Sequence, residues 1–109
     1  MKILIIEGDP KLRALLAQEA QSSIRGCDLI AEAETSSAAL AICSTFKPEM
    51  AVLDIDLPDG DGLDLIPRLR EKILGLRVLV ISDRVTPEIV DRCEELEIED
   101  FADKPTVAG

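Results

Sequence analysis

Acidic side chains follow two apolar segments of the sequence, and a hydroxyl and a lysine follow two others. Glu7 and Asp9 come after the first apolar run, and Asp54 closes the third. Ser82 ends the fourth run, and Lys104 follows the short fifth one. Acids at the end of a buried strand are costly unless a cation lies near them. Carboxylates of this kind, with a lysine and a hydroxyl, could hold a hard divalent cation and handle a phosphoryl group.

Positioning these residues together requires a particular order of elements, which the hydrophobic pattern supplies. Apolar runs predict strands near residues 2–6, 27–33, 49–54, 77–82 and 98–102, and helical patterns lie between them. Pro67 predicts that the third helix is kinked or begins late. Strands that alternate with helices give an α/β, doubly wound parallel sheet with helices on both faces. The site then lies beyond the carboxyl ends of the strands, where all five chemical residues fall.

Composition excludes several classes of function. The 109 residues suffice for one domain and carry a formal charge of −10, so direct contact with nucleic acid is not expected. No histidine is present, which excludes Ser-His-Asp and Cys-His catalysis and most zinc sites. The three cysteines form no metal or redox pair and predict buried free thiols. No apolar stretch reaches bilayer length, so we expect a cytoplasmic protein without membrane contact.

The ordered set of motifs resembles the receiver domain of two-component response regulators. The stretch "ILIIEGDPKLR" is similar to the acidic entry motif, and "VLVIS" ends in the hydroxyl residue. In "LDIDLPDGDGLDLI", Asp54 is followed by Pro58 four residues on and by Gly62 eight on, as in the phosphoacceptor segment. "DFADKP" supplies the aromatic Phe101 and the lysine Lys104. The longer stretch "PEMAVLDIDLPDGDGLDLI" also resembles the subfamily whose effector is a DNA-binding helix-turn-helix domain.

The resemblance implies a flavodoxin-like sheet of five strands in the order 2-1-3-4-5, within a single receiver domain over residues 1–109. Receivers usually end in a fifth helix. Only four residues follow Pro105, so we expect this last helix to be missing and the domain to be C-terminally short. An apolar face would then be left bare, so we expect either that the chain is truncated or that a homodimer covers this face. The resemblance also predicts a cis peptide before Pro105.

The resemblance assigns the chemistry of phosphoryl transfer to three residues. Asp54 is the expected phosphoacceptor, Lys104 pairs with it and then with the phosphoryl group, and Ser82 swings in to hydrogen-bond the new phosphate. Ser82 and Phe101 form the expected switch that turns a local charge change into a surface change. Such a domain is not an enzyme, although it assists its own phosphorylation and dephosphorylation.

The expected cofactor is Mg²⁺, because a cation cancels the repulsion between a carboxylate and a phosphoryl group. By the resemblance its ligands are Glu7, Asp54 and the backbone carbonyl of Asp56, with Asp9 as a weaker candidate. Gly8 stands where the family has a second acid and offers no side chain. Water could fill that position, so we expect weak binding that Gly8→Asp would strengthen.

Two further departures concern the rim of the site. Asp83 follows Ser82 where the family has a very small residue, and it adds bulk and negative charge. Phe101 stands where tyrosine is common, which removes a hydroxyl. Two hypotheses therefore stay open. The chain is either a working receiver whose sequence has drifted, or an atypical receiver that acts as an interaction module without phosphorylation.

The implied function is two-component signal transduction, including phosphorelay and transcription regulation. The implied partners are a sensor histidine kinase or a phosphotransfer protein, together with an output domain or a protein partner. A rival hypothesis is a haloacid-dehalogenase-type phosphatase, in which Asp54 is the nucleophile and Asp56 the general acid. Against it, that motif normally ends the first strand of its domain, and here two strands precede it. The sequence names neither the kinase nor the output.

Overall fold

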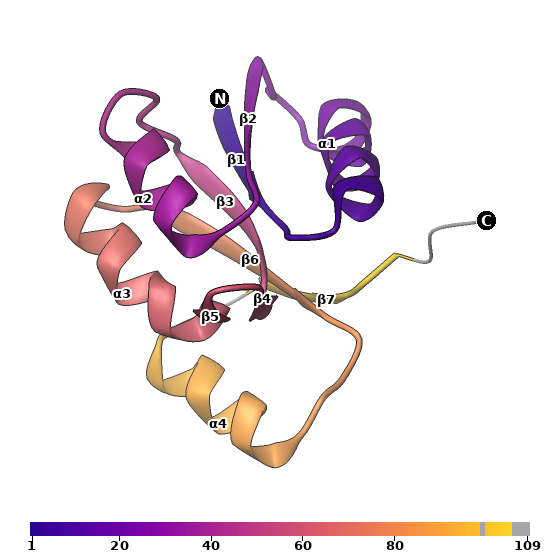
Figure 1. The fold of residues 1–109 in the computed structure, drawn as a ribbon, viewed down its shortest axis with the longest axis vertical. Coiled ribbons are helices and arrows are strands. Elements are labelled where there is room, and N and C mark those ends of the chain that lie inside the picture. Colours follow the sequence, from indigo (N-terminus) through magenta and orange to yellow (C-terminus); the bar gives the residue numbers. More distant parts are fainter. Residues whose placement is uncertain (99, 106–109) are drawn as a thin grey trace.

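In the computed structural model, which describes residues 1–98 and 100–105, the main strands form one parallel sheet (Figure 1). Its order is β2-β1-β3-β6-β7, which confirms the predicted order 2-1-3-4-5. The strands of this sheet are β1 (Lys2–Ile6), β2 (Leu29–Ala33), β3 (Met50–Asp54), β6 (Arg77–Ser82) and β7 (Asp100–Asp103). The helices are α1 (Pro10–Ser23), α2 (Ser36–Cys43), α3 (Gly62–Lys72) and α4 (Pro87–Glu95).

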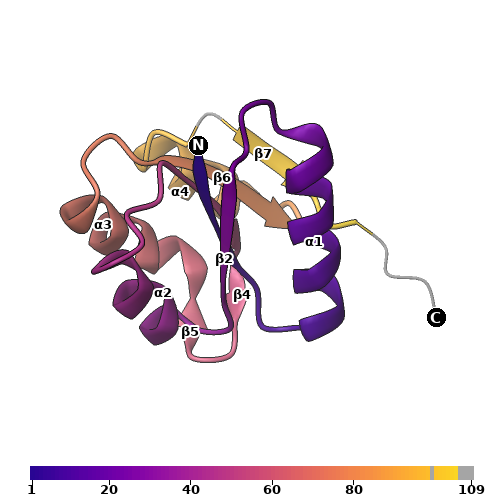
Figure 2. The same cartoon turned by 90° about the horizontal axis from the view of Figure 1, so that it is seen from above.

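The helices cover the two faces of the sheet unequally. In Figure 2, α1 lies alone on one side, while α2 and α3 lie on the other; α4 joins them in the same hydrophobic cluster. Alternate residues of β1 point to opposite faces, so that Ile3 and Ile5 pack toward α1 while Leu4 and Ile6 pack toward the other helices. Both faces are therefore apolar, which is why the central strands read as continuous hydrophobic runs.

A hollow of about 190 Å³ lies beside α1 on its side of the sheet. Mostly apolar side chains line it, among them Leu16, Ala20, Leu79, Ile81 and Ala102. The expectation that a fifth helix is missing concerns residues 106–109, which lie outside the described residues. Among the described residues, no helix is both long and apolar enough to cross a membrane.

The helix boundaries follow from capping groups. Asp9, Thr35 and Thr86 each accept backbone N–H bonds at the first turn of α1, α2 and α4. The sequence predicted that Pro67 either kinks the third helix or delays its start. The delayed start is wrong, because α3 begins at Gly62, where Asp61 caps it, and continues through Pro67 to Lys72.

A small hairpin that the sequence did not reveal precedes α3. Its strands are β4 (Asp56–Leu57) and β5 (Gly60–Asp61), paired antiparallel. The hairpin turn is attached to α2, because the Asp59 carboxylate accepts the backbone N–H groups of Ser36 (2.9 Å) and Ser37 (3.2 Å). The cysteine prediction is only partly right: Cys43 and Cys93 are buried free thiols, whereas Cys27 is half-buried.

Candidate functional site

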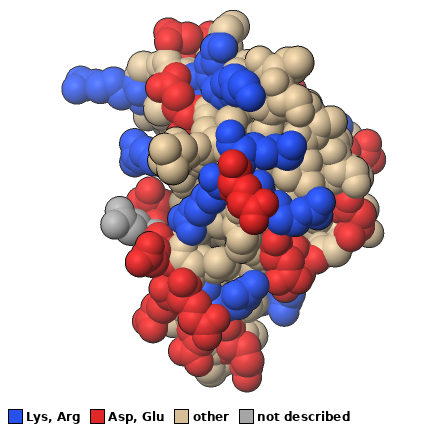
Figure 3. Space-filling view, turned by 90° about the vertical axis from the view of Figure 1, so that its left-hand side faces the viewer, with Lys and Arg blue, Asp and Glu red and all other residues tan. Residues whose placement is uncertain are grey.

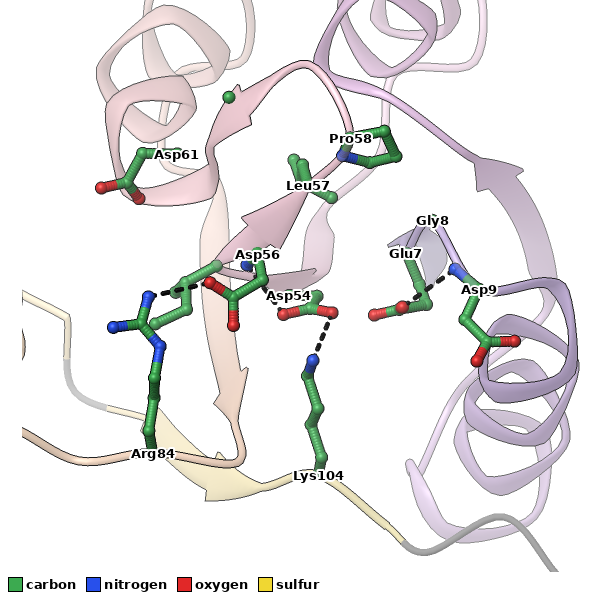
Figure 4. A pocket seen from close by; sticks show the side chains of 12 residues that line it. Glu7, Gly8, Asp9, Asp54, Asp56, Leu57, Pro58, Asp61, Arg84 and Lys104 are labelled. Atoms are coloured by element: carbon green, nitrogen blue, oxygen red, sulfur yellow. Dashed lines mark hydrogen bonds and ion pairs between the residues drawn. The ribbon is translucent and has the colours of Figure 1, made fainter.

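The strand register brings the predicted residues to one edge of the sheet. Ile6 pairs with Leu53, so Glu7 and Asp54, the residues that follow them, end their strands at the same level. Asp54 pairs in turn with Ile81, which places Ser82 one residue further along the next strand. This edge opens into a cleft of about 520 Å³ (Figure 4), lined by Glu7, Gly8, Asp9, Asp54, Ile55, Asp56, Leu57, Pro58, Gly60, Asp61, Arg84 and Lys104.

Asp54 lies at the centre of the cleft and is only 1% exposed. The backbone N–H of Asp56 donates to its Oδ1 at 2.9 Å. Its Oδ2 faces the Lys104 ammonium, with Nζ 2.8 Å away, in an ion pair rather than an aligned hydrogen bond. The backbone of Gly62 packs against the same strand end: a Cβ there would stand 2.5 Å from the Asp54 carbonyl oxygen. Only glycine lets α3 begin this close to the acceptor, which explains the spacing of eight residues.

Lys104 reaches Asp54 from the end of β7. Its backbone N–H donates to the Ser82 carbonyl at 3.1 Å and so extends the pairing of β7 with β6. Burial lowers the pKa of Lys104, but the ion pair with Asp54 and the charge of Glu7 outweigh burial and leave the pKa raised. No cis peptide occurs among the described residues, so the predicted cis bond before Pro105 is wrong. The strand pairing directs Lys104 at the acceptor with a trans bond.

Glu7 is buried beside Asp54 and is 3% exposed. Its Oε1 accepts the backbone N–H of Asp9 at 3.0 Å, and its Oε2 has no hydrogen-bond partner among the described residues. Burial raises the pKa of Glu7 to about 8, and the neighbouring Asp54 carboxyl adds to the effect, whereas the Asp9 N–H opposes it. Two carboxyl groups thus share a buried space that holds one lysine.

The residues present fit a divalent cation with few protein ligands. The orphaned Oε2 of Glu7 is a buried acceptor next to Asp54, and oxygen is the ligand that Mg²⁺ prefers. The described residues contain no cluster of three or more acidic, cysteine or histidine side chains placed to hold a metal. Asp9 lies at the rim, where its Oδ1 already accepts two N–H groups of α1. A cation here would keep several water ligands.

The Pro58 ring leaves no room for a side chain at position 8. A Cβ added at Gly8 would lie 2.8 Å from both Cγ and Cδ of the Pro58 ring, closer than such atoms approach in real structures. Gly8 is not among the residues with positive φ, so the requirement is for space rather than for backbone conformation. The proline ring fills the room that a second acid would need. Simple restoration of a ligand by Gly8→Asp therefore meets a steric obstacle that the sequence did not show.

We predict that Gly8→Asp destabilises the domain in a chelating buffer by about 1–3 kcal/mol, through overpacking against Pro58 and repulsion from the Asp54 carboxylate. Gly8→Ala isolates the steric part. Adding Pro58→Ala to Gly8→Asp should recover stability and bind Mg²⁺ more tightly than the wild type. Urea unfolding with chelator and calorimetric Mg²⁺ titration measure the two effects. Wild-type stability in Gly8→Ala would show that the ring does not require the glycine.

The remaining predicted residues differ in how close they come to Asp54. Ser82 is fully buried, but its hydroxyl donates to the Arg84 carbonyl at 2.7 Å. Asp83 is exposed and does not line the described cleft, although its charge raises the pKa of Lys104 slightly. Phe101 lies on β7, opposite Val80, and is 37% exposed. The structure therefore brings Glu7, Asp54 and Lys104 together and leaves Phe101 outside this group.

Sequence reasoning missed Arg84. Its Nη2 donates to Asp56 Oδ1 at 2.8 Å, and this bond is the largest cause that lowers the pKa of Asp56. The sequence contained a signal for Arg84, because a basic residue two positions after Ser82 falls in a loop at the carboxyl edge of the sheet. A lowered pKa is the opposite of what a general acid needs, so the arrangement does not favour the phosphatase hypothesis.

The family model for the response regulator receiver domain matches residues 3–108. The chain belongs to this family. Among similar proteins, the transcriptional regulatory protein BasR of Escherichia coli K12 is 35% identical over 107 residues, which cover 96% of this chain and 46% of BasR. The receiver domain therefore spans about half the length of the curated relatives it matches, whose names describe transcriptional regulators.

Solved structures show the same fold. The signal receiver domain of NarL from Mycobacterium tuberculosis superposes with a TM-score of 0.82 at 25% identity and covers 97% of this chain and 85% of its own. A response regulator from Burkholderia pseudomallei, with a phosphorylated aspartic acid, a calcium ion and citrate, gives 0.83 at 22% identity, covering 97% and 61%. The family membership and fold establish a receiver domain of two-component signalling, a signalling domain rather than an enzyme in the usual sense.

Proposed function

We propose that Asp54 is the residue on which this receiver domain accepts a phosphoryl group. The observation that supports this most strongly is the buried Asp54 carboxylate with the Lys104 ammonium 2.8 Å away. Of the other acids that line the cleft, Glu7 is buried but has a pKa raised to about 8, which keeps it protonated and a poor nucleophile at neutral pH. The three others have partners of their own. Asp9 and Asp61 cap helices, and Asp56 pairs with Arg84. Asp54 alone combines burial, an ammonium partner and a place at the centre of the cleft.

In the proposed reaction, an Asp54 carboxylate oxygen attacks the phosphorus of the donor. A new O–P bond forms, and the bond between phosphorus and the leaving group breaks, its electron pair going to the leaving group. Lys104 then pairs with the phosphoryl oxygens and offsets the charge that they bring. Ser82 donates to one of these oxygens once its present bond to Arg84 is released. Ser82 and Phe101 are the proposed switch residues through which the change reaches the surface.

The proposed cofactor is Mg²⁺, held by Glu7, by Asp54 and by the Asp56 carbonyl, with water in the place that Gly8 leaves. When bound, it neutralises charge on the transferred oxygens and lowers the repulsion between two anionic reactants. Glu7 contributes the buried oxygen that has no other partner among the described residues. Asp9 stays a candidate ligand through the oxygen that does not cap α1.

The proposed partners follow from the family. A sensor histidine kinase or a phosphotransfer protein supplies the phosphoryl group in the cytoplasm, and an output domain or protein reads the switched surface. We infer that residues 1–109 are a single receiver domain, the counterpart of the half that BasR shares. The formal charge of −10 does not suit contact with nucleic acid. Figure 3 shows acidic side chains gathered over the lower part of one face, where α4 carries four acids and one arginine, and basic side chains above them.

The hollow beside α1 needs a cover in the assembled protein. Its lining is mostly apolar, and one helix alone lies on that face among the described elements. We infer that a second copy of the domain packs there. Sedimentation of this chain at rising concentration tests this inference: a dimer supports it, and a monomer at every concentration contradicts it.

The alternative of an interaction module that works without phosphorylation keeps one specific observation in its favour. Pro58 occupies the space of the second acid beside Gly8, so the cation site has fewer protein oxygens. The test is incubation with acetyl phosphate and Mg²⁺, followed by intact mass. We expect one added phosphoryl group, and none when a chelator replaces Mg²⁺. An unchanged mass with Mg²⁺ present would favour the alternative.

A further inference from the structure

Arg84 connects two parts of the site through three hydrogen bonds. The Ser82 hydroxyl donates to the Arg84 carbonyl oxygen at 2.7 Å, and the Arg84 backbone N–H donates back to Ser82 Oγ at 3.1 Å. The Arg84 guanidinium donates to Asp56 Oδ1 at 2.8 Å, as the dashed line in Figure 4 marks. The loop after β6 is thereby tied to the hairpin that follows Asp54.

These bonds determine to which oxygen the Ser82 hydroxyl can donate. A serine hydroxyl has one hydrogen to donate, and here the Arg84 carbonyl oxygen receives it. Ser82 therefore cannot donate to an oxygen on Asp54 while the loop keeps this arrangement. For it to do so, the backbone at Arg84 has to move, and the ion pair with Asp56 restrains that movement.

We propose that Arg84 is a positioning residue, whose ion pair with Asp56 keeps Ser82 bonded to its own loop until a phosphoryl group on Asp54 competes for the Ser82 hydroxyl. The proposal rests on the proposed role of Asp54. In this proposal, the ion pair sets the equilibrium between two orientations of the Ser82 hydroxyl: one bonded to the Arg84 carbonyl oxygen, the other donating to an oxygen on Asp54.

The charges in the cleft favour such an exchange. Five acids and two cations, Arg84 and Lys104, line it among the described residues. Lys104 already pairs with Asp54, and Asp56 lies beside the acceptor because its N–H donates to Asp54 Oδ1. A phosphoryl group on Asp54 brings nearly two more negative charges beside Asp56 and offers new acceptor oxygens to the Ser82 hydroxyl.

The pair is also weak enough to be displaced. The side chains of Arg84 and Asp56 are 56% and 43% exposed, so water and salt screen their attraction. A restraint of this strength alters a conformational equilibrium by a few-fold without blocking the switch.

Two substitutions separate this restraint from the general charge of the cleft. Arg84→Gln removes a cation and Asp56→Asn removes an acid, so their effects on the charge of the cleft are opposite. Both break the same ion pair. With beryllofluoride as a phosphoryl mimic at saturating Mg²⁺, we expect both variants to bind it about two- to fivefold more tightly than the wild type at low salt. The matched control is Arg92→Gln. It breaks an exposed ion pair of 3.0 Å with Asp64, outside the cleft, and should leave the affinity for beryllofluoride unchanged.

Amide hydrogen exchange supplies a readout without any ligand. The amide of residue 84 donates to Ser82 Oγ, so it should exchange faster in both variants. In Arg92→Gln its exchange rate should equal that of the wild type. In a Ser82→Ala background, the gain in beryllofluoride affinity should vanish. Affinities that move in opposite directions in the two variants would overturn the proposal and leave only cleft charge. A wild type that binds no beryllofluoride would instead overturn the proposed function of Asp54.

Discussion

Asp54→Asn should reduce phosphoryl labelling by acetyl phosphate to background. The amide is a far weaker nucleophile than the carboxylate. Asp9, Asp56 and Asp61 are engaged elsewhere, and the pKa of Glu7 is raised to about 8, which keeps it protonated at neutral pH. The ammonium of Lys104 also loses the charged partner that holds it 2.8 Å from Oδ2. Intact mass measures the result, with the wild type labelled in parallel under the same Mg²⁺ concentration.

The matched control for Asp54→Asn lies two residues along the chain. Asp56→Asn removes an acid from the same cleft but keeps the backbone carbonyl and the N–H that donates to Asp54 Oδ1. We expect this variant to label at least as well as the wild type. Full labelling in Asp54→Asn would show that another side chain is the acceptor.

Glu7→Gln should stabilise the domain at neutral pH when divalent cations are chelated. The pKa of Glu7 is raised from 4.5 to about 8 in the folded state, chiefly by burial and then by the Asp54 carboxyl. Between these two values the folded state binds more protons than the unfolded state, so the free energy of unfolding falls as pH rises. The slope is about 1.4 kcal/mol per pH unit, and the accumulated loss at pH 7 is about 3 kcal/mol.

Urea unfolding from pH 4 to pH 8 measures this effect. The wild type and Glu7→Gln should have similar stability near pH 4 and diverge as pH rises, with Glu7→Gln the more stable. Added Mg²⁺ should narrow the gap, because a cation that binds only the folded wild type stabilises it by mass action. Glu71→Gln, at an exposed position on α3, is the control. Parallel curves for wild type and Glu7→Gln would show that Glu7 is not held in its protonated form.

The strand ends could be predicted because two strong signals coincide there. Continuous apolar runs fix β1, β3 and β6, since strands buried on both faces leave little freedom in the pattern. Acids, a hydroxyl and a lysine at those ends then mark the edge where parallel strands place a site. Asp54 and Lys104 were found in this way, and the strand register explains why both lie at the same edge of the sheet.

The contacts that the sequence did not reveal depend on close packing between distant segments. The role of Gly8 as room for the Pro58 ring follows from two residues 50 positions apart, and no local pattern signals their approach. The short hairpin before α3 has two-residue strands, below the length that periodicity can detect. The prediction of a late start for α3 rested on the low helix propensity of Pro67. In the structure, the Asp61 cap and the packing of Gly62 place the start earlier.

The central claim, that Asp54 carries the phosphoryl group, is tested most directly by chemical trapping. Borohydride reduces an aspartyl phosphate to homoserine, and peptide mass spectrometry then locates that residue after labelling with acetyl phosphate and Mg²⁺. We predict homoserine at position 54 and at no other acid of the cleft. Homoserine at position 7, 9, 56 or 61, or its absence from a protein whose mass shows one added phosphoryl group, would contradict the account.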